Sequence, residues 1–353
     1  MEDYPEMQGS VCPAPLPHNE TIVMGHGSGG LLTQDLINRI FLPAFSNPAL
    51  LAGNDFALLE NESNFRIVVS TDAHIVTPLF FPGGDIGRLA VSGTINDIAV
   101  SGGTPIGLTA SFILEEGLPM EVLAKVAQSM ADTAAEAGVP IVAGDTKVVE
   151  HGKADGLFIS TTGIAKISRE ITINGANAKP GDAVIISGTL GDHGMAVLAA
   201  RGELGVVSQI RSDTAPLNHL IQKILQICPQ IHAMRDPTRG GLATTLNEIS
   251  QQSQVGITIR EDRIPVRPEV NAICELLGFD PLYVANEGKV IVILPEPFVD
   301  EVLDEMHRHP YGTDAKRIGW VHAESAGEVH LSTRIGGTRL LSVMSGEMLP
   351  RIC

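Results

Sequence analysis

The sequence has few aromatic residues, few cysteines and few basic residues, and each shortage excludes a class of protein. Phe, Trp and Tyr make up 4% of the 353 residues, which argues against a base-stacking platform for single-stranded nucleic acid. The four cysteines lack CxxC spacing, which argues against a disulfide framework and a zinc site. Acidic residues outnumber basic residues by 41 to 24, so the overall field repels nucleic acids and anionic membranes.

Long hydrophobic runs are also missing. No stretch approaches the 18 continuous apolar residues of a transmembrane helix, and the acidic, proline-rich start MEDYPEMQGSVCPAPLPHNE is unlike a secretory signal. Hydrophobic residues nevertheless make up 44% of the chain, which is enough for packed cores. We therefore expect a cytoplasmic protein with free thiols, no nucleic-acid partner and no membrane partner. The length suggests two domains.

The hydrophobic periodicity predicts strands interleaved with helices in both halves of the chain. We expect an α+β fold of mixed sheets with helices on one sheet face. The expected segments are a flexible arm at 1–20, domains at 21–170 and 171–341, and a mobile tail at 342–353. The predicted helices are Thr33–Phe45, Asp85–Ser101, Pro119–Gly138, His193–Gly202, Pro216–Ile227, Gly240–Gln251, Pro268–Leu277 and Pro297–His309.

The predicted strands follow from apolar runs between turn residues. Those of the first domain include Ile141–Ala143 and Leu157–Ile167, both of which we expect to be buried. The segment Ala178–Gly188 opens with a turn and starts the second domain. The other predicted strands are Phe65–Thr71, Ile106–Leu114, Gly256–Ile259, Lys289–Leu294, Ile318–His322, Val329–Ser332 and Thr338–Leu341.

Four aspartates of the first half lie at predicted strand ends or tight turns: Asp55, Asp72, Asp97 and Asp145. Carboxylates that converge on one point repel each other unless a cation lies between them. Oxygen ligands suit Mg²⁺, which takes part of its shell from the phosphates of a nucleotide. The set therefore indicates a magnesium–nucleotide site. Each of the four aspartates, taken alone, is equally well explained as a turn or helix-cap residue.

Two glycine-rich stretches are candidates for contact with phosphates. GHGSGG (25–30) leads into the first predicted helix, and RGGL (239–242) opens another. Backbone N–H groups at the start of a helix suit an anion. Neither stretch has the GxxxxGK[ST] pattern, and neither follows the strand that a dinucleotide fingerprint needs. Tight turns explain both about as well.

Three further residues are candidates for chemistry. Lys147 lies two residues after Asp145 and could neutralise a transferring phosphoryl group. Glu287, in a glycine-terminated turn, could act as a general base. Cys353 is the last residue, and the seven residues after Gly346 could extend roughly 23 Å, long enough to carry a modified thiol. The alternatives are a surface ion pair, a surface carboxylate and an incidental terminal cysteine.

The chain resembles the HypE family of hydrogenase maturation factors, which are carbamoyl dehydratases of the superfamily that includes aminoimidazole ribonucleotide synthetase (the PurM-like fold). The motifs behind this resemblance extend from Thr21 to Cys353. The most specific motifs are FFPGGDIG (80–87) and the terminal PRIC (350–353). The others are HGSGG (26–30), the longer run STDAHIVTPLFFPGGDIGRLAVSGTINDIAVSGG (70–103) around the first of these, ILEEGLPM (113–120), AGDTKVVEHG (143–152), SGTLGDHGMAVL (187–198), RDPTRGGLATTLNE (235–248) and ANEGK (285–289). Two departures are Asn54, where the superfamily has a paired aspartate, and the arm 1–20 with Cys12, which receives no role.

The resemblance implies a reaction and a role for each candidate. A partner carbamoyltransferase carbamoylates Cys353, ATP phosphorylates the carbamoyl oxygen, and loss of phosphate leaves a thiocyanate. An iron–cyanide scaffold complex then delivers the cyanide to [NiFe] hydrogenase. Mg²⁺ and Lys147 serve the phosphoryl transfer, and Glu287, or less favourably His26, is the base. The chain would form a homodimer through its N-terminal domains. The remaining nucleotide-binding positions are Gly27, Gly29, Gly30, Asp192, Asp236 and Arg239.

Two other functions stay open at this stage. One is another ATP-using enzyme of the superfamily, of the selenophosphate synthetase or thiamine-phosphate kinase type. The other is a non-catalytic scaffold that presents Cys353 to partners. An enzyme for small molecules needs no terminal cysteine, and a carrier needs no Mg²⁺-dependent ATP hydrolysis. Deletion of Cys353 and an ATPase assay would separate the three.

Overall fold

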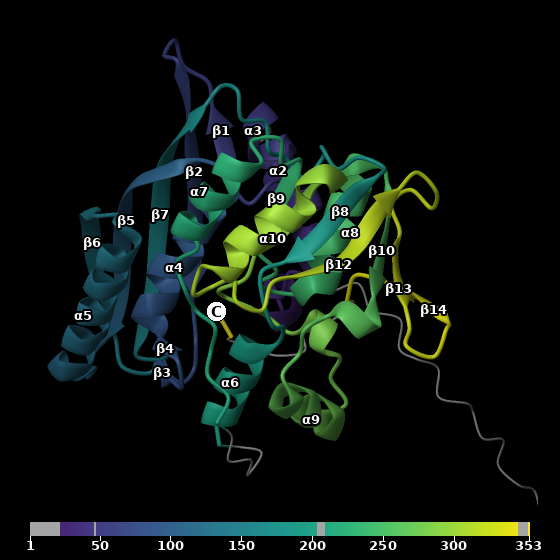
Figure 1. Cartoon of the computed structure of the whole chain (residues 1–353). Helices are drawn as coiled ribbons and strands as arrows, with labels where there is room; N and C mark the ends of the chain where they lie inside the picture. The colour runs from purple at the N-terminus through teal and green to yellow at the C-terminus, as the bar shows by residue number, and fades with distance from the viewer. Residues whose placement is uncertain (1–21, 46, 203–208, 345–351) are drawn as a thin grey trace, which may run out of the picture.

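The computed structural model describes residues 22–45, 47–202, 209–344 and 352–353. Two mixed sheets come from successive parts of the chain, 57–168 and 182–341, and stand beside each other in Figure 1. The α+β class with mixed sheets is therefore confirmed. None of the helices in the described ranges is long and apolar enough to span a membrane.

The N-terminal sheet has the strand order β1-β2-β7-β5-β6, with only the β5–β6 pair parallel. Helices α4 and α5 cover one face, as expected. Asp85 caps α4 by accepting hydrogen bonds from the Gly87 and Arg88 amides, and Gly138 ends α5 in the left-handed region. The elements are β1 (Ala57–Leu59), β2 (Phe65–His74), α4 (Ile86–Ala99), β5 (Thr104–Glu115), α5 (Met120–Ala137), β6 (Ile141–Val149) and β7 (Leu157–Ser168), with the separate hairpin β3 (Phe80–Phe81) and β4 (Gly84–Asp85).

The prediction of a short, buried strand at Ile141–Ala143 is wrong. Strand β6 continues to Val149 and is exposed along nearly its whole length, because it is the edge strand of the sheet. Exposed apolar side chains lie on it and on its neighbour β5, among them Ile113, Val142 and Val148. One face of the N-terminal sheet thus remains open.

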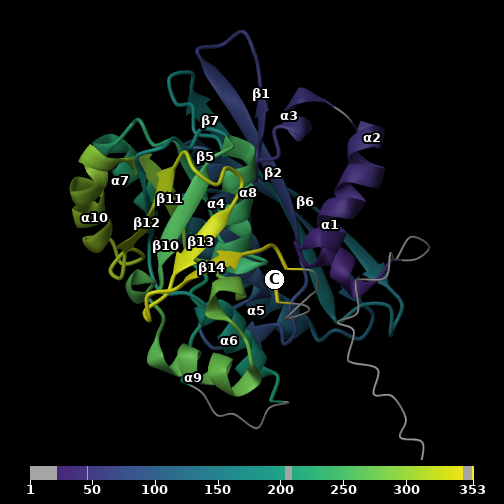
Figure 2. The ribbon, with the colours of Figure 1, turned by 90° about the vertical axis from the view of Figure 1, so that its right-hand side faces the viewer.

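The C-terminal sheet has the order β14-β13-β10-β12-β8-β11-β9. Here helices cover both faces, which differs from the expected single face: Ile185 of β8 packs with α7 and α10, whereas Ile186 packs with α8. Figure 2 shows the sheet between these helices. The elements are β8 (Asp182–Ile186), α6 (Asp192–Ala200), α7 (Asn218–Ile227), β9 (Ala233–Arg235), α8 (Gly241–Ser253), β10 (Gly256–Arg260), α9 (Pro268–Leu277), β11 (Ile291–Pro295), α10 (Val299–His307), β12 (Lys316–His322), β13 (Val329–Ser332) and β14 (Thr338–Leu341).

The N-terminal helical segment packs less tightly than its apolar stripe suggests. The predicted helix Thr33–Phe45 is one continuous run of α1 (Leu31–Leu36), a π-helical turn η2 (Ile37–Phe41) and α2 (Leu42–Phe45), and none of its residues is buried. The short elements around it are η1 (Met24–Gly27) and α3 (Pro48–Leu51). Short 3₁₀ turns in the C-terminal half are η3 (Glu261–Arg263), η4 (Pro281–Tyr283) and η5 (Glu296–Phe298).

The C-terminus lies where the two halves of the chain meet, beside α4 and α6 in Figure 1. The Ile352 side chain is buried, packed with residues that include Val76, Phe81 and Val197. The Ile75 N–H donates a hydrogen bond to a terminal oxygen of Cys353 (3.2 Å). Residues 345–351 of the expected tail lie outside the described residues, and so does the arm 1–20. Ile352 and Cys353 therefore have a defined position between the two halves, which we call the seat of the C-terminus.

Candidate active site

A cavity of about 770 Å³ opens at the junction of the two halves. Both glycine-rich stretches line it, one through Gly27 and the other through Arg239 and Gly240. The Arg239 guanidinium donates to the Gly27 carbonyl (2.8 Å). Gly29 has φ 78°, and an added Cβ there would lie 3.2 Å from the Arg239 side chain. The two stretches, 212 residues apart, therefore form one wall of the cavity.

The first glycine-rich stretch also supports the chain that leads to the C-terminus. An added Cβ at Gly30 would lie 2.7 Å from the Met344 carbonyl oxygen, to which the Leu31 N–H donates (3.1 Å). His26 is buried in this stretch, and its Nδ1 is 3.0 Å from the Val23 amide nitrogen. His26 thus closes its own turn, and it is not among the residues that line the cavity.

Three carboxylates converge beside the cavity from both halves of the chain: Asp236 is buried, and Asp72 and Asp97 are half-buried. Asp72 is on β2, Asp97 is on α4, and Asp236 follows β9. Burial raises the pKa of Asp97 well above its ordinary value, and the charges of Asp72 and Asp236 raise it further. Burial also raises the pKa of Asp236 well above its ordinary value, with added effects from the charges of Asp55 and Asp72. A cation placed among these carboxylates would relieve their mutual repulsion.

Asp55 joins this group from the loop before β1. Its Oδ1 accepts a hydrogen bond from Arg235 (2.7 Å), whereas its Oδ2 is buried without a hydrogen-bond partner. Burial raises the pKa of Asp55, and the Arg235 charge opposes that rise. Within the described ranges, no three side chains of His, Cys, Asp or Glu yet surround a single metal position. The oxygen-only donors and the unpartnered oxygen nevertheless fit a Mg²⁺ ion whose shell is completed by phosphates and water.

Asp145 and Lys147 lie apart from this group. They pair with each other on β6 (2.7 Å), and their side chains are 63% and 71% exposed. Asp145 is in register with Ser111, on the open face of the sheet, whereas Asp72 faces α4. Strands β2 and β6 are three strand spacings apart, roughly 14 Å. A single chain therefore does not bring Asp145 and Lys147 to the other three aspartates.

Glu287 lies between the carboxylates and the C-terminal thiol. Its side chain is buried, its Oε1 has no hydrogen-bond partner, and the Cys353 thiol lies close enough to interact with its carboxylate. An added Cβ at Gly93 of α4 would lie 3.7 Å from Asp72 Oδ2 and 4.0 Å from Glu287 Oε2, so the two carboxylates flank this glycine. Burial raises the pKa of Glu287 well above its ordinary value, helped by Asp236 and other aspartates. A carboxyl group with a raised pKa is a stronger base than an ordinary carboxylate, which suits it to proton transfer.

The position of the Cys353 thiol disfavours its thiolate form. Burial raises the pKa of Cys353 to about 12, with the Arg239 charge opposing the rise and the charges of Glu287 and Asp72 adding to it. Nucleophilic attack requires the thiolate. In this position Cys353 can hold a group that is already attached to its sulfur, but it is poorly suited to attack a donor and acquire that group.

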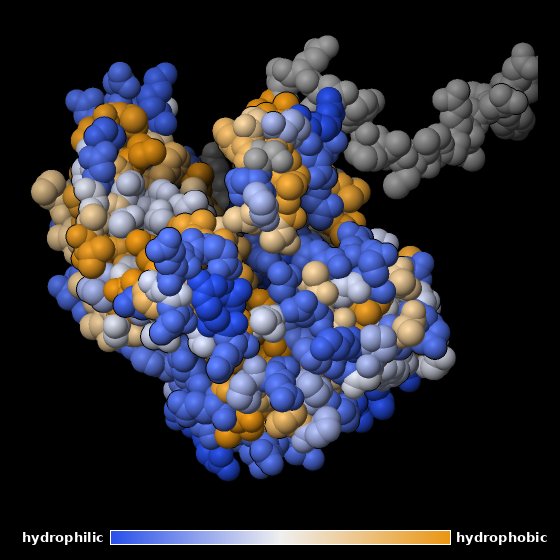
Figure 3. All heavy atoms as spheres, turned by 90° about the horizontal axis from the view of Figure 1, so that it is seen from above, coloured by the Kyte–Doolittle hydropathy of each residue, from blue (hydrophilic) through white to orange (hydrophobic). Residues whose placement is uncertain are grey.

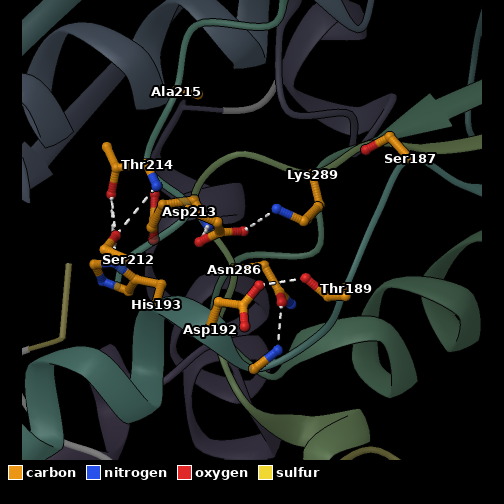
Figure 4. Close-up of polar contacts among 12 residues, drawn as sticks. Ser187, Thr189, Asp192, His193, Ser212, Asp213, Thr214, Ala215, Asn286 and Lys289 are labelled. Carbon is orange, nitrogen blue, oxygen red and sulfur yellow. Dashed lines mark hydrogen bonds and ion pairs between the residues drawn. The ribbon is translucent and has the colours of Figure 1, made fainter. Parts of the chain in front are cut away.

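Buried polar contacts fix the backbone around Glu287. The Asp213 carboxylate accepts from the Glu287 N–H (3.1 Å) and from the Lys289 ammonium (2.9 Å). Asn96 donates to the Glu287 carbonyl (3.3 Å), and Asn286 accepts from the Gly191 N–H (2.8 Å). Figure 4 shows Asp213, Lys289 and Asn286 around this loop. Removing one partner of a buried ion pair typically costs about 3–5 kcal/mol, so the Asp213–Lys289 pair is a firm support.

Asp192, the first residue of α6, lies among the polar side chains that surround the Glu287 loop. The Thr189 hydroxyl donates to its carboxylate, and Arg267 lies 3.4 Å from it. Burial raises the pKa of Asp192. Its neighbours here are Asp213 and Lys289, as Figure 4 shows. Its nucleotide-binding role stays a prediction.

Sequence reasoning missed the supports of the site. Asp213 and Lys289 are separated by 76 residues, and Asn96 lies 191 residues from Glu287. No local pattern marks such pairs, since the fold alone brings them together. The signal for Arg235 was available in part, because it precedes Asp236 in the RDPTRGG motif. Nothing in the sequence linked Arg235 with Asp55.

Comparison with known proteins first assigns the chain to a class. The family model described as the N-terminal domain of AIR synthase related proteins matches residues 53–167, and the model for the C-terminal domain of these proteins matches residues 179–332. A structure of AaThiL complexed with AMPPCP and TMP, 19% identical with a TM-score of 0.67, shares the fold. The protein therefore has the fold of the AIR synthase related class.

Closer relatives define the family within this class. Carbamoyl dehydratase HypE of Cupriavidus necator is 54% identical over 332 residues, covering 94% of this chain and 95% of that protein. The HypE of Escherichia coli is 46% identical, covering 94% and 99%. A structure of hydrogenase maturation protein HypE in complex with ATP is 48% identical, covers 94% of this chain and 100% of its own, and has a TM-score of 0.79. A HypE–HypF complex is 48% identical, with coverages of 88% and 99% and a TM-score of 0.83. The chain belongs to the carbamoyl dehydratase HypE family, which confirms the resemblance seen in its motifs.

Proposed function

We propose that this chain is an ATP-dependent carbamoyl dehydratase that converts a carbamoyl group on its own Cys353 into a thiocyanate, a source of cyanide for hydrogenase maturation. The observation that carries this proposal is the contact of the C-terminal thiol with Glu287 inside the cleft. A small-molecule kinase of the same fold has no need to seat its terminal cysteine there. The named relatives, all of the HypE family, support the same function.

The chemistry removes oxygen from a thiocarbamate as phosphate. The carbonyl oxygen attacks the γ-phosphorus of ATP, ADP leaves, and the nitrogen loses one proton. The carbon–oxygen bond then breaks, phosphate leaves with the second proton, and S–C≡N remains. Glu287, whose raised pKa suits proton exchange, is placed to receive the nitrogen proton. The tight wall formed by Gly27, Gly29 and Arg239 is placed to hold the phosphates.

Mg²⁺ would supply charge neutralisation for the phosphates. Asp55, Asp72 and Asp97 would hold it, with Asp236 beside them. The nucleotide brings further oxygens, which accounts for the incomplete metal shell of the side chains alone. The relative solved with ATP supports the nucleotide half of this proposal.

A homodimer would supply Asp145 and Lys147. These residues lie on the open sheet face, which also carries the exposed Ile113. Hydrophobic side chains interrupt the polar surface on both sides of a hollow in Figure 3. An open apolar face of this kind is typical of an interface. We therefore assign Asp145 and Lys147 to the site of the partner copy, where Lys147 would neutralise the transferring phosphoryl group.

For this function, Cys353 must also leave its seat and reach other proteins. A carbamoyltransferase must reach a thiolate, which Cys353 does not form in its seat. The complex of a relative with HypF supports a partner at this stage, and an iron–cyanide scaffold complex would collect the product. Cys228, Cys274 and Cys353 are free thiols, as the chemistry needs and as the reducing cytoplasm favours.

Intact-mass measurement tests the function directly. After incubation with the carbamoyltransferase and its substrates, the chain should gain the mass of one carbamoyl group. Addition of Mg²⁺ and ATP should then remove the mass of one water. An unchanged mass throughout would favour an enzyme for small molecules, and a carbamoyl gain without water loss would favour a carrier scaffold.

Removal of divalent metal should weaken nucleotide binding. Bare ATP would meet the carboxylates Asp72 and Asp97 and the net charge of −17. Calorimetry with excess chelator should show at least a tenfold loss of ATP affinity, about 1.4 kcal/mol or more. Asp72→Asn and Asp145→Asn should each mimic the chelator, whereas Asp300→Asn on α10 should not.

Equal ATP affinity with and without Mg²⁺ would contradict the metal site. A mixture of Asp72→Asn and Asp145→Asn chains tests the shared site, because a mixed dimer contains one intact set of ligands. Recovery of part of the tight binding on mixing is expected. No recovery would place Asp145 in the site of its own chain or in none.

A further inference from the structure

His193 is fully buried next to the C-terminal tail, and the reaction described above does not use it. Its Nε2 lies 2.7 Å from the carbonyl oxygen of Ile352, the residue before the reacting cysteine. Its Nδ1 lies 2.8 Å from the Ser212 hydroxyl. Figure 4 shows His193 beside Ser212 and Thr214, on the side of the loop away from Lys289.

The hydrogen-bond partners determine where the proton of His193 lies. A carbonyl oxygen can only accept, so Nε2 must carry the proton and Nδ1 must accept. The Ser212 hydroxyl (2.8 Å) is the nearer donor to Nδ1, with the Thr214 hydroxyl at 3.4 Å. The Ser212 oxygen then accepts from the Thr214 N–H (3.1 Å) and from the Thr214 hydroxyl (2.6 Å). Burial lowers the pKa of His193, which keeps the ring neutral. In this arrangement Thr214 donates to Ser212, Ser212 donates to His193, and His193 donates to the Ile352 carbonyl.

The family-specific FFPGGDIG motif holds this arrangement in place. Phe81 meets the His193 ring edge-on, with centroids 5.5 Å apart at 85°. The Ser212 N–H donates to the Pro82 carbonyl (2.7 Å). Gly83 has φ 95°, and an added Cβ would lie 2.6 Å from the backbone nitrogen and oxygen of Ser212. The hairpin β3–β4 therefore packs directly on His193, the partner of the tail carbonyl, and on Ser212, the partner of His193.

We propose that His193, set by Ser212 and Thr214 in the form that carries its proton on Nε2, is the positioning residue that seats Ile352 so that the Cys353 thiol lies against Glu287. The role of His193 in dehydration rests on the proposed function. The hydrogen bond that holds Ile352 does not, and it can be tested on the isolated chain. His193 holds the tail during dehydration and must release it before the thiol can react with a partner.

The test is the alkylation rate of Cys353 by iodoacetamide, followed peptide by peptide by mass spectrometry, with no ATP and no partner. Alkylation requires the thiolate, so its rate follows the fraction of chains with an unseated tail. His193→Leu should raise the Cys353 rate about tenfold, the factor that 1.4 kcal/mol represents, because the buried Ile352 carbonyl loses its donor. His193→Gln keeps an N–H donor near the Nε2 position and should stay within about threefold of the parent.

Two controls separate seating from general loosening. His307→Leu removes another histidine–carbonyl contact, that of His307 with Ala315 in the C-terminal half (2.9 Å), and should leave the Cys353 rate unchanged. The buried Cys228 and Cys274 report global opening in the same experiment. If His193→Leu also raises the alkylation rates of Cys228 and Cys274, the milder variant Ser212→Ala becomes the test. Ser212→Ala should raise the alkylation rate of Cys353 severalfold and leave the rates of Cys228 and Cys274 unchanged.

The two steps of the reaction should also respond in opposite directions. His193→Leu should speed carbamoylation of Cys353 and slow its dehydration, a split that a merely structural defect would not produce. A Cys353 alkylation rate that is unchanged in His193→Leu, or in Ser212→Ala where that variant decides, would overturn the proposal. Equal acceleration by His193→Leu and His193→Gln would also overturn it, because the hydrogen bond would then not matter. If alkylation behaves as expected but no dehydration occurs in the parent, only the proposed function fails.

Discussion

Glu287→Gln is expected to slow thiocyanate formation by about 10²–10⁴-fold, the usual effect of losing a general base. Gln keeps the shape of the side chain but cannot accept the nitrogen proton. Carbamoylation and phosphoryl transfer should continue, so single-turnover quenching should show ADP before any loss of water from the chain. Lys147→Ala should instead stop ADP formation, because the phosphoryl transfer loses its cation.

The pH dependence of the parent provides a second test of Glu287. The pKa of Glu287 is raised, so the carboxylate form that acts as a base is lost as the pH falls through a value well above 4.5. The dehydration rate should therefore fall with decreasing pH in that range, and Glu287→Gln should lose this dependence. Glu305→Gln, at a half-buried ion-pair partner on α10, serves as the control. A Glu287→Gln protein with the parental rate would leave His26 as the base to test.

Cys353→Ala should abolish every step after ATP binding, since it removes the acceptor of the carbamoyl group. Its ATP affinity should be close to that of the parent, because the carboxylates and the glycine-rich wall remain. Carbamoyl-dependent ADP release and water loss should both be undetectable in the same assays. Cys274→Ala, at a buried cysteine outside the site, is the control and should keep parental turnover. Full turnover in Cys353→Ala would identify an enzyme for small molecules.

Local signals in the sequence predicted most of the helices. The apolar spacing and the terminal Gly138 predicted a helix at Pro119–Gly138, and α5 runs from Met120 to Ala137 with Gly138 as its left-handed cap. Both effects act within a few residues, so they are visible in one sequence. Short strands such as Ala57–Leu59 gave no such signal, because three residues show no periodicity.

Exposure of the N-terminal sheet could not be predicted in the same way. The run at Ile141–Ala143 has the composition of a buried strand, but β6 lies at an edge whose outer face is open. Composition reports that a surface is apolar, not whether this chain or another covers it. The register has the same limitation, since only the pairing of β6 with β5 shows that Asp145 lies opposite Ser111.

The candidate site was predictable only where motifs carried it. Asp72, Asp97 and Asp236 came from motifs, and the structure brings them together. Glu287 reached the cleft by resemblance alone, and the structure now places it beside Cys353. Their roles remain proposals. The residues that orient them, such as Asp213 and His193, act across long sequence separations, and their partners depend on the folded chain.

Infrared spectroscopy of the carbamoylated chain tests directly whether the nitrile forms on Cys353. The carbamoyl group is introduced with ¹³C, the labelled protein is freed of its partner, and Mg²⁺ and ATP are added. We expect a nitrile absorption that shifts with the ¹³C label, appears together with ADP, and is absent from Glu287→Gln and Cys353→Ala. ADP release from the parent without any labelled nitrile on the chain would contradict this expectation.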